Sequence, residues 1–389
     1  MYASAQRTAS DGHPPASGGW AARCRFRVSR PGASVREVAD AVEDRHDRLA
    51  AYESYGSGLP IGQARRAAEN FRHFAGVITA FGEDAFRQGG AGEEQLSYVI
   101  RRPAGVAGLI TPWNTPFMLQ SWKLAPALAA GCAAVLKPSE WTPLSASLWP
   151  EILTSSGVPA GVVNIVHGTG PEAGQSLVDH PGAPLVSFTG STATGRRILR
   201  SCAERLKAAS MELGGKSPVV VFADADVEAA LDTVVFGAFS LNGERCTAGS
   251  RVLVESPLYE EFTRRLADRA ARIRVGPSSD PATEVGPLVH ADHYRRVLEY
   301  TRTGREEARL VVGGRVEIYT SDCCTGDPGH GTYRWNVHDD RRRDFWGNAV
   351  IESWYKEASP VHDLGGAVRP VSGGPLEESS ARVGADGLG

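Results

Sequence analysis

The sequence has no long apolar run and no excess of one charge. Its longest apolar stretch, Leu124 to Leu136, is too short to span a bilayer and is followed by Lys137. The polar residues before Cys24 lack the apolar centre of a secretory signal. A formal net charge of −3 over 389 residues gives no electrostatic reason to expect nucleic acid or an anionic membrane. We therefore expect neither of these partners.

Cysteine is also scarce. The six cysteines follow no disulfide or zinc-ligand spacing, and the adjacent Cys323 and Cys324 have no CxxC or histidine partner nearby. Such cysteine usage is typical of a reducing compartment. The composition, 42% hydrophobic and 22% charged, is that of an ordinary globular protein. We expect a soluble, cytoplasmic protein without a metal site.

The chain divides into zones of different character. Residues 1–34 are rich in glycine, proline and serine, and we expect them to be disordered. Residues 35–213 begin with apolar residues at helical spacing and continue as β-rich runs that alternate with helical runs. This alternation predicts parallel strands joined by crossover helices, an α/β fold. The expected strands are Val106–Ile110, Ala133–Leu136, Val162–Val166, Leu185–Thr189, Ala208–Leu213 and Val219–Phe222.

The alternation continues and then stops. Residues 214–314 contain an expected strand at Arg251–Val254 and a helical run at Pro257–Ile273, which predict a second, partial α/β domain. Residues 315–389 contain glycine, proline and scattered tryptophans without a sustained period. We expect this last zone to be atypical and poorly ordered.

Two glycine-containing stretches carry the groups of a covalent acyl-transfer reaction. Gly243-Glu244-Arg245-Cys246 offers a thiol, and the earlier Met211-Glu212-Leu213-Gly214-Gly215 offers a carboxylate. A thiolate can form an acyl intermediate, and a carboxylate can activate the water that hydrolyses it. Alone, the cysteine would more often be a buried structural residue and the glutamate a surface residue that caps a turn. Their combination favours the catalytic interpretation.

Three further stretches each follow an expected strand, where α/β proteins build their sites. They are Thr111-Pro112-Trp113-Asn114-Thr115-Pro116, Leu136-Lys137-Pro138-Ser139-Glu140 and Phe188-Thr189-Gly190-Ser191-Thr192. In the third, a glycine turn and a helix start provide N–H groups and a hydroxyl that can bind a pyrophosphate. Alone, a Gly-Ser-Thr cap or an Asn-Thr-Pro turn is a weak signal, because both are common.

In this order, the five stretches resemble those of the aldehyde dehydrogenase superfamily. The resemblance implies that Cys246 is the nucleophile, Glu212 the general base and Asn114 a donor to the oxyanion, together with the Cys246 backbone N–H. We expect Cys246 at the N-terminal edge of a helix, where the helix dipole activates a thiol.

The same resemblance implies a nicotinamide cofactor. Lys137 and Glu140 look like the clamp on the adenosine ribose, and a carboxylate there favours NAD over NADP because it repels a 2′-phosphate. Gly190 and Ser191 look like the pyrophosphate turn. Further residues expected on the cofactor side of the site are Trp113, Leu213 and Gly170.

The resemblance extends from about Val42 to Gly314 and implies an architecture. We expect an α/β, aldehyde-dehydrogenase-like fold: a Rossmann-type NAD-binding domain at residues 35–213, with an interface hairpin near 93–105, and an incomplete α/β catalytic domain at residues 214–314. The family's Glu-Glu-Ile-Phe-Gly-Pro motif is not recognisable in residues 315–389, so divergent or truncated termini are expected. Relatives form homodimers or tetramers, an expectation that altered termini weaken here.

One branch of the superfamily is most similar. Gly58-Leu59-Pro60-Ile61, Asn70-Phe71-Arg72 and the segment from Leu241 to Thr247 look most like the (5-carboxymethyl-)2-hydroxymuconate semialdehyde dehydrogenases of aromatic catabolism. Such substrates carry carboxylates, and Arg245, beside the nucleophile, is a candidate to bind one. A structural ion pair of Arg245 is the alternative.

The expected function is NAD-dependent oxidation of a small-molecule aldehyde to a carboxylic acid, through a Cys246 thiohemiacetal and thioester. A cofactor-independent thioester hydrolase or esterase would use the same cysteine and glutamate but would leave Lys137 and Glu140 without a role. An inactive or weakly active truncated relative is the third interpretation. A CoA-acylating enzyme is disfavoured, because it has to exclude the water that Glu212 would activate.

Overall fold

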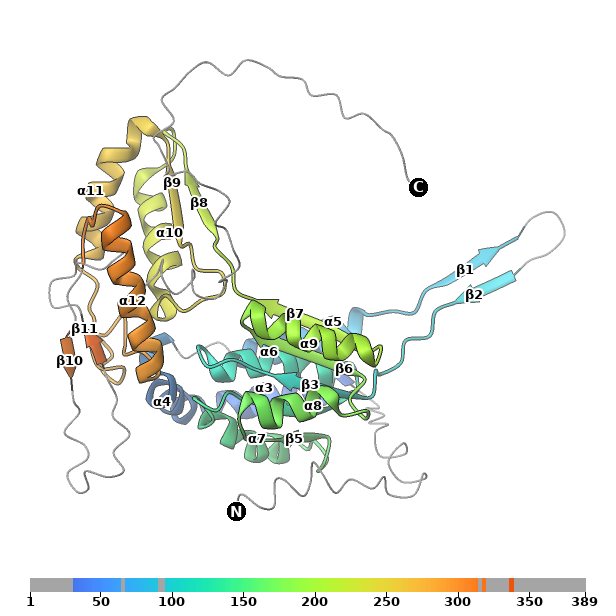
Figure 1. Ribbon diagram of the computed structural model, residues 1–389. Helices are drawn as coiled ribbons and strands as arrows, with labels where there is room; N and C mark the ends of the chain where they lie inside the picture. Colours follow the sequence, from blue (N-terminus) through green and yellow to red (C-terminus); the bar gives the residue numbers. More distant parts are fainter. Residues whose placement is uncertain (1–30, 64–66, 90–94, 314–316, 320–335, 339–389) are drawn as a thin grey trace, which may run out of the picture.

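A five-stranded parallel sheet organises the larger part of the molecule. The computed structural model describes residues 31–63, 67–89, 95–313, 317–319 and 336–338. Within these residues the main sheet has the strand order β5-β4-β3-β6-β7, with all neighbours parallel (Figure 1). Its strands are β3 (Val106–Ile110), β4 (Ala133–Lys137), β5 (Val163–Ile165), β6 (Leu185–Gly190) and β7 (Ala208–Leu213). The sequence-based expectation of a Rossmann-like α/β fold is confirmed.

Helices connect these strands and cover the sheet. The connecting helices are α6 (Pro116–Ala129), α7 (Trp149–Ser155), α8 (Gln175–Asp179) and α9 (Thr192–Glu204), and the helices before the sheet are α3 (Pro31–Glu43), α4 (His46–Ser57) and α5 (Ala67–Ala80). Because β4 lies on one side of β3 and β6 on the other, the strand order reverses at β3. Sheets of this kind bind ligands beyond the carboxyl ends of the strands at such a point.

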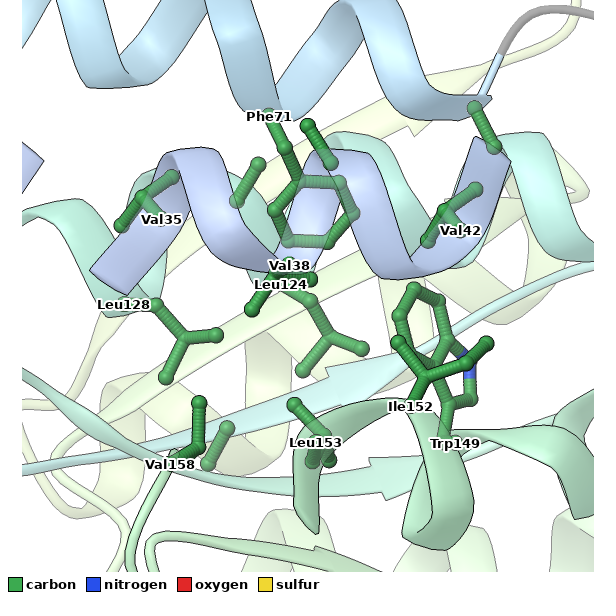
Figure 2. Close-up of a cluster of buried hydrophobic side chains, with 14 of the residues drawn as sticks. Val35, Val38, Val42, Phe71, Leu124, Leu128, Trp149, Ile152, Leu153 and Val158 are labelled. Atoms are coloured by element: carbon green, nitrogen blue, oxygen red, sulfur yellow. The ribbon is translucent and has the colours of Figure 1, made fainter. Parts of the chain in front are cut away.

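The core of this part lies between the helices and the sheet. Figure 2 shows side chains of α3, α5, α6 and α7 meeting in one cluster, with Phe71, Leu124 and Trp149 among its largest members. The Trp149 ring stacks on Phe117 at a centroid distance of 4.2 Å, and its indole N–H donates to Gln120 at 2.7 Å. The buried polar atom of the indole is therefore satisfied, as burial of tryptophan requires.

A smaller α/β unit follows β7. Its parallel strands β8 (Pro218–Val221) and β9 (Arg251–Val254) pack with α10 (Val227–Phe239) and α11 (Tyr259–Ala270), and a separate buried cluster includes Leu231 and Phe262. Helix α12 (Ala291–Glu307), which we did not expect from the sequence, comes next. The described part of residues 315–389 is the antiparallel pair β10 (Glu317–Tyr319) and β11 (Asn336–His338).

Two expectations about the ends of these zones differ from the structure. Strands β1 (Ala85–Gln88) and β2 (Gln95–Tyr98) form an antiparallel arm that extends from the body (Figure 1), earlier in the chain than the hairpin expected near 93–105. Helix α3 begins at Pro31, inside the zone 1–34 that we expected to be disordered. The rest of that zone, and nearly all of 315–389, lies outside the described residues. The domain boundary at 213/214 stays a prediction.

A buried carboxylate fixes the start of α6. Thr115, at the N-cap of α6, makes no side-chain cap hydrogen bond. Instead, the backbone N–H of Phe117 donates to Glu53 Oε1 of α4 at 2.9 Å. Burial raises the pKa of Glu53 to about 7, and the hydrogen bond from Phe117 only partly offsets this rise. Glu53 thus caps a helix end at the cost of holding an acid away from water.

This raised pKa predicts a pH-dependent stability. Since the folded pKa of about 7 lies above the ordinary value of 4.5, the contribution of Glu53 is fully present below pH 4.5 and is lost as the pH rises through 7. Glu53→Gln keeps an acceptor for the Phe117 N–H but cannot ionise. We expect the difference in unfolding free energy between Glu53→Gln and wild type to increase by about 2–3 kcal/mol, in favour of the variant, from pH 5 to pH 8.

Urea unfolding of both proteins at the two pH values measures this difference. Asp47→Asn, which removes an exposed carboxylate from the same helix, is the matched control and should show little change. A Glu53→Gln effect that is equal at both pH values would contradict the assignment.

Candidate active site

The sequence-predicted residues converge on one edge of the main sheet. Trp113 and Asn114 follow β3, Lys137 ends β4 and Glu140 follows it, Gly190 ends β6 and Ser191 follows it, and Glu212 and Leu213 end β7. Because these strands are parallel, all four ends lie at the same edge. This edge includes the point between β3 and β6 at which the strand order reverses.

The three predicted catalytic side chains share a cavity. Cys246, Glu212 and Asn114 line one hollow of about 1040 Å³, together with apolar side chains that include Met118 and Trp122. This volume is at the upper end of the range for small-molecule sites. The structure therefore brings the thiol, the carboxylate and the amide together, although they come from three distant parts of the sequence.

The cysteine does not lie where we expected it. Cys246 is in a turn that follows α10 and the short segment η4 (Ser240–Gly243), whose backbone at Leu241 and Asn242 is not right-handed helical. It therefore comes after the C-terminal end of a helix and not at an N-terminal edge, so the expected help from a helix dipole is wrong. The reason is an unusual turn: Leu241, Asn242 and Gly243 all have positive φ, at 56°, 57° and 70°. This left-handed run ends the helix and reverses the chain before the cysteine.

The turn is held from outside its own unit. The buried Asn242 side chain accepts from the Gly286 N–H at 2.7 Å and donates to the Gly58 carbonyl at 3.2 Å. The Leu241 N–H donates to Gln63 Oε1 at 2.6 Å. At Gly58, with φ of 81°, a Cβ would lie 2.0 Å from the Pro287 carbonyl oxygen, so glycine is required for this close approach.

A second glycine lies beside the nucleophile. A Cβ on Gly215 would come within 3.2 Å of the Cys246 carbonyl oxygen. The chain after Glu212 therefore passes directly against the cysteine turn, and the absence of a side chain allows this approach. Gly215 therefore lets the segment after Glu212 approach the cysteine turn, so that the carboxylate and the thiol line the same cavity.

The asparagine is oriented by the cysteine turn. Asn114 is buried, and its Nδ2 donates to the Glu244 carbonyl at 2.6 Å. A side-chain amide has two N–H groups. With one of them directed to Glu244, the planar amide also fixes the direction of the other.

Sequence reasoning missed a buried lysine at this site. Lys123 of α6 donates to Ser187 Oγ at 2.7 Å. Burial lowers its pKa to about 8, and the charge of Glu212 partly opposes that fall. A perturbed cation that interacts with the predicted base is a functional candidate. The available signal was a single lysine within the mostly apolar run of α6.

The predicted cofactor residues lie outside this cavity and form their own arrangement. Lys137 Nζ contacts Glu140 Oε2 at 2.7 Å, and the Gly170 N–H donates to Glu140 Oε1 at 3.3 Å. Partial burial raises the pKa of Glu140, but the hydrogen bond and charge of Lys137 outweigh it, and the net shift is downward. Glu140 is thus held ionised beside a buried ammonium.

The pyrophosphate-type turn begins a helix. Ser191 is the N-cap of α9, and its Oγ accepts from the Thr194 N–H at 3.3 Å. A Cβ on Gly195 would lie 2.8 Å from Leu213 Cδ2, so glycine lets α9 pack closely against β7. A strand, a turn and an unobstructed helix start are a suitable anion site when a ligand is present. The donor set fits a dinucleotide.

Trp113 has a different environment from the other predicted residues. Its ring lies 4.9 Å from the ring of His293, which belongs to α12.

No group of three or more potential metal ligands occurs among the residues that the structure describes. Over the same residues, no helix is long and apolar enough to cross a membrane.

Known proteins similar to this chain give its family. The chain matches the aldehyde dehydrogenase family over residues 8–339. It is 46% identical over 286 residues to 5-carboxymethyl-2-hydroxymuconate semialdehyde dehydrogenase from Escherichia coli, a match that covers 72% of this chain and 60% of the relative. The crystal structure of HpcC from Thermus thermophilus is similar with a TM-score of 0.75 and 40% identity, covering 90% of this chain and 71% of that chain.

An NAD⁺ complex of aldehyde dehydrogenase from Bacillus cereus is similar with a TM-score of 0.74 and 34% identity, covering 86% of this chain and 68% of that one. The chain spans 58–64% of the length of the curated relatives that it matches. The family match covers more than half of the chain and includes the cysteine, glutamate and asparagine stretches. The chain belongs to the aldehyde dehydrogenase family.

Proposed function

We propose that the chain catalyses the NAD-dependent oxidation of an aldehyde to a carboxylic acid. The observation that carries this proposal is the shared cavity of Cys246, Glu212 and Asn114. A nucleophile, a base and an oxyanion donor around one space are the parts that acyl transfer to water needs. Membership of the family makes this chemistry the first hypothesis to test.

In the proposed mechanism, Cys246 Sγ adds to the aldehyde carbon and forms a thiohemiacetal. The negative charge that develops on oxygen receives hydrogen bonds from the second N–H of Asn114 and from the Cys246 backbone. After oxidation to the thioester, Glu212 takes a proton from water, which attacks the acyl carbon and releases the acid. The C–S bond breaks in this last step, and the thiol is restored.

The cofactor proposed for this reaction is NAD. When bound, it supplies the acceptor for the hydride of the aldehyde carbon. Lys137 and Glu140 would hold the adenosine ribose, and the Gly170 N–H donates to Glu140. An ionised Glu140 disfavours the 2′-phosphate of NADP. The remaining cofactor residues would be Gly190 and Ser191 at the pyrophosphate, with Trp113 and Leu213 nearby.

The proposed substrate is a carboxylated semialdehyde from aromatic catabolism. Arg245 lines the cavity, and its guanidinium is held in place: Nη1 donates to Ser240 Oγ at 2.8 Å, and the group lies 4.9 Å from the Phe236 ring centroid. A cation fixed in this way can bind a substrate carboxylate through charge-assisted hydrogen bonds. The name of the Escherichia coli relative refers to a substrate of this class.

The arrangement of Lys137, Glu140 and Gly170 disfavours the cofactor-independent hydrolase, which has no use for it. An inactive or weakly active member of the family remains the other alternative. Assembly into a homo-oligomer and a cytoplasmic location stay predictions. The exposed Leu96 and Tyr98 of the β1–β2 arm are compatible with contact between subunits.

Removal of the two reactive groups tests the mechanism. With a semialdehyde and NAD, we expect Glu212→Gln to lower steady-state turnover by about 10²- to 10⁴-fold, because the thioester is no longer hydrolysed. A single burst of NADH, stoichiometric with enzyme, should remain in this variant. Cys246→Ser should lose both burst and turnover, whereas Cys202→Ser, a buried cysteine of α9, is the control.

Absorbance at the NADH wavelength, followed by stopped flow, separates the burst from the steady state. A Cys246→Ser variant that turns over at the wild-type rate would refute the proposed nucleophile. Wild type that hydrolyses a thioester repeatedly, yet forms no NADH from any semialdehyde, would instead support the hydrolase.

The substrate proposal has its own test. We expect Arg245→Ala to lower kcat/KM for a carboxylated semialdehyde by about 10- to 100-fold, the worth of a charge-assisted hydrogen bond. An uncharged aldehyde of similar size should be affected little, since it has no group for the guanidinium. An equal loss for both aldehydes would assign Arg245 a structural role.

A further inference from the structure

Glu244, two residues before the nucleophile, contacts two partners at once. Its backbone carbonyl accepts from Asn114 Nδ2 at 2.6 Å. Its side-chain Oε1 lies 3.4 Å from His293 Nε2 of α12. Both side chains are almost fully buried, with 1% of Glu244 and 3% of His293 exposed. The residue that accepts from the proposed oxyanion donor is therefore itself in contact with a histidine from a different element.

The same histidine contacts the asparagine loop directly. The rings of His293 and Trp113 are 4.9 Å apart and inclined by 54°. Trp113 immediately precedes Asn114 in the chain. The contacts thus form a closed circuit from Trp113 through Asn114, Glu244 and His293 back to Trp113. A closed circuit restricts the loop after β3 and the cysteine turn more strongly than one hydrogen bond can.

The start of α12 fixes the histidine in turn. His290 is the N-cap of α12, and its Nδ1 accepts from the His293 N–H at 3.1 Å. The His290 ring stacks on Trp141 at 3.9 Å, one residue beyond the predicted ribose clamp. The first turn of α12 is therefore anchored on loops that follow β3 and β4.

We propose that His293 is a positioning residue that, through Glu244 and Trp113, holds the Asn114 amide in register with Cys246. The proposal rests on the proposed role of Asn114 as oxyanion donor. Neither His293 nor Glu244 lines the cavity, so neither is proposed to touch substrate. A buried carboxylate that loses its partner moves or recruits water, and a shift of Glu244 displaces the carbonyl that Asn114 uses.

An ester assay reads this geometry without the cofactor. With p-nitrophenyl acetate, Cys246 Sγ attacks the acetyl carbon, a C–S bond forms, the C–O bond to the aryl group breaks, and p-nitrophenolate leaves. The rate of the first release reports acylation, with Cys246→Ser as the blank. We expect His293→Leu to lower the maximal acylation rate by about 10- to 100-fold, the effect of a misplaced catalytic group, with little change in the half-saturating ester concentration.

Two variants separate positioning from general loosening of α12. His293→Gln retains a side-chain N–H that can reach Glu244 and should restore most of the rate. Val297→Ala, at a buried position one turn along the same helix, is the matched control and should acylate at a near wild-type rate. If His293→Leu does not fold, Glu244→Gln tests the same contact from the other side, with a slowed acylation expected.

A double-mutant cycle decides whether the histidine acts through the asparagine. In an Asn114→Ala background, His293→Leu should cause no further loss, because the group that it positions is already absent. Losses that multiply, or an equal loss in Val297→Ala, would overturn the proposal. So would wild-type protein that shows no Cys246-dependent acylation.

These results remain distinct from failure of the proposed function. A chain that acylates at Cys246 in the expected His293-dependent way, yet produces no NADH from any semialdehyde, would refute dehydrogenase activity and leave the positioning role supported.

Discussion

The hydrogen bond from Asn114 Nδ2 to the Glu244 carbonyl is the interaction on which the site depends. It joins the loop after β3 of the main sheet to the turn that carries Cys246. The amide and the thiol come from different units, so neither fold alone sets the distance between them. Because the bond is buried, water does not compete for it, and losing it would leave a carbonyl and an amide unsatisfied. The bond therefore fixes the Asn114 amide relative to the turn that carries Cys246.

Much of the fold was accessible from the sequence because its signals are local. Strands β3 and β7 have the expected bounds, Val106–Ile110 and Ala208–Leu213. Strands β4 and β6 differ by one residue at one end, and β5 by one residue at each end. Short β-rich runs between amphipathic helices leave little freedom in a parallel sheet. Once the strands are parallel, residues placed just after them must share one edge. That is why Asn114 and the proposed cofactor residues could be placed at this edge beforehand, whereas their roles stay predictions.

The position of Cys246 was not accessible in the same way. A helix dipole at the cysteine was a reasonable expectation from sequence, but the left-handed run Leu241 to Gly243 ends the preceding helix instead. Leucine rarely adopts positive φ, and no local pattern predicts it here. The conformation is imposed by distant partners, Gln63 and Gly286 among them. Helix α12 and the buried Lys123 were missed for a related reason, since their importance lies in what they contact.

The contacts of the cysteine turn explain how a site can exist on a small second sheet. Strands β8 and β9 form a two-stranded sheet in the described residues, and Val220 and Leu253 are 54% and 45% exposed. Two strands alone give marginal stability. The turn, however, is tied to Gly58 after α4, to Gly286 before α12 and to Asn114 after β3. These attachments lie outside β8 and β9. The geometry of the nucleophile therefore depends on the larger body and on the segment before α12 more than on the β8–β9 sheet, between whose strands Cys246 lies in sequence.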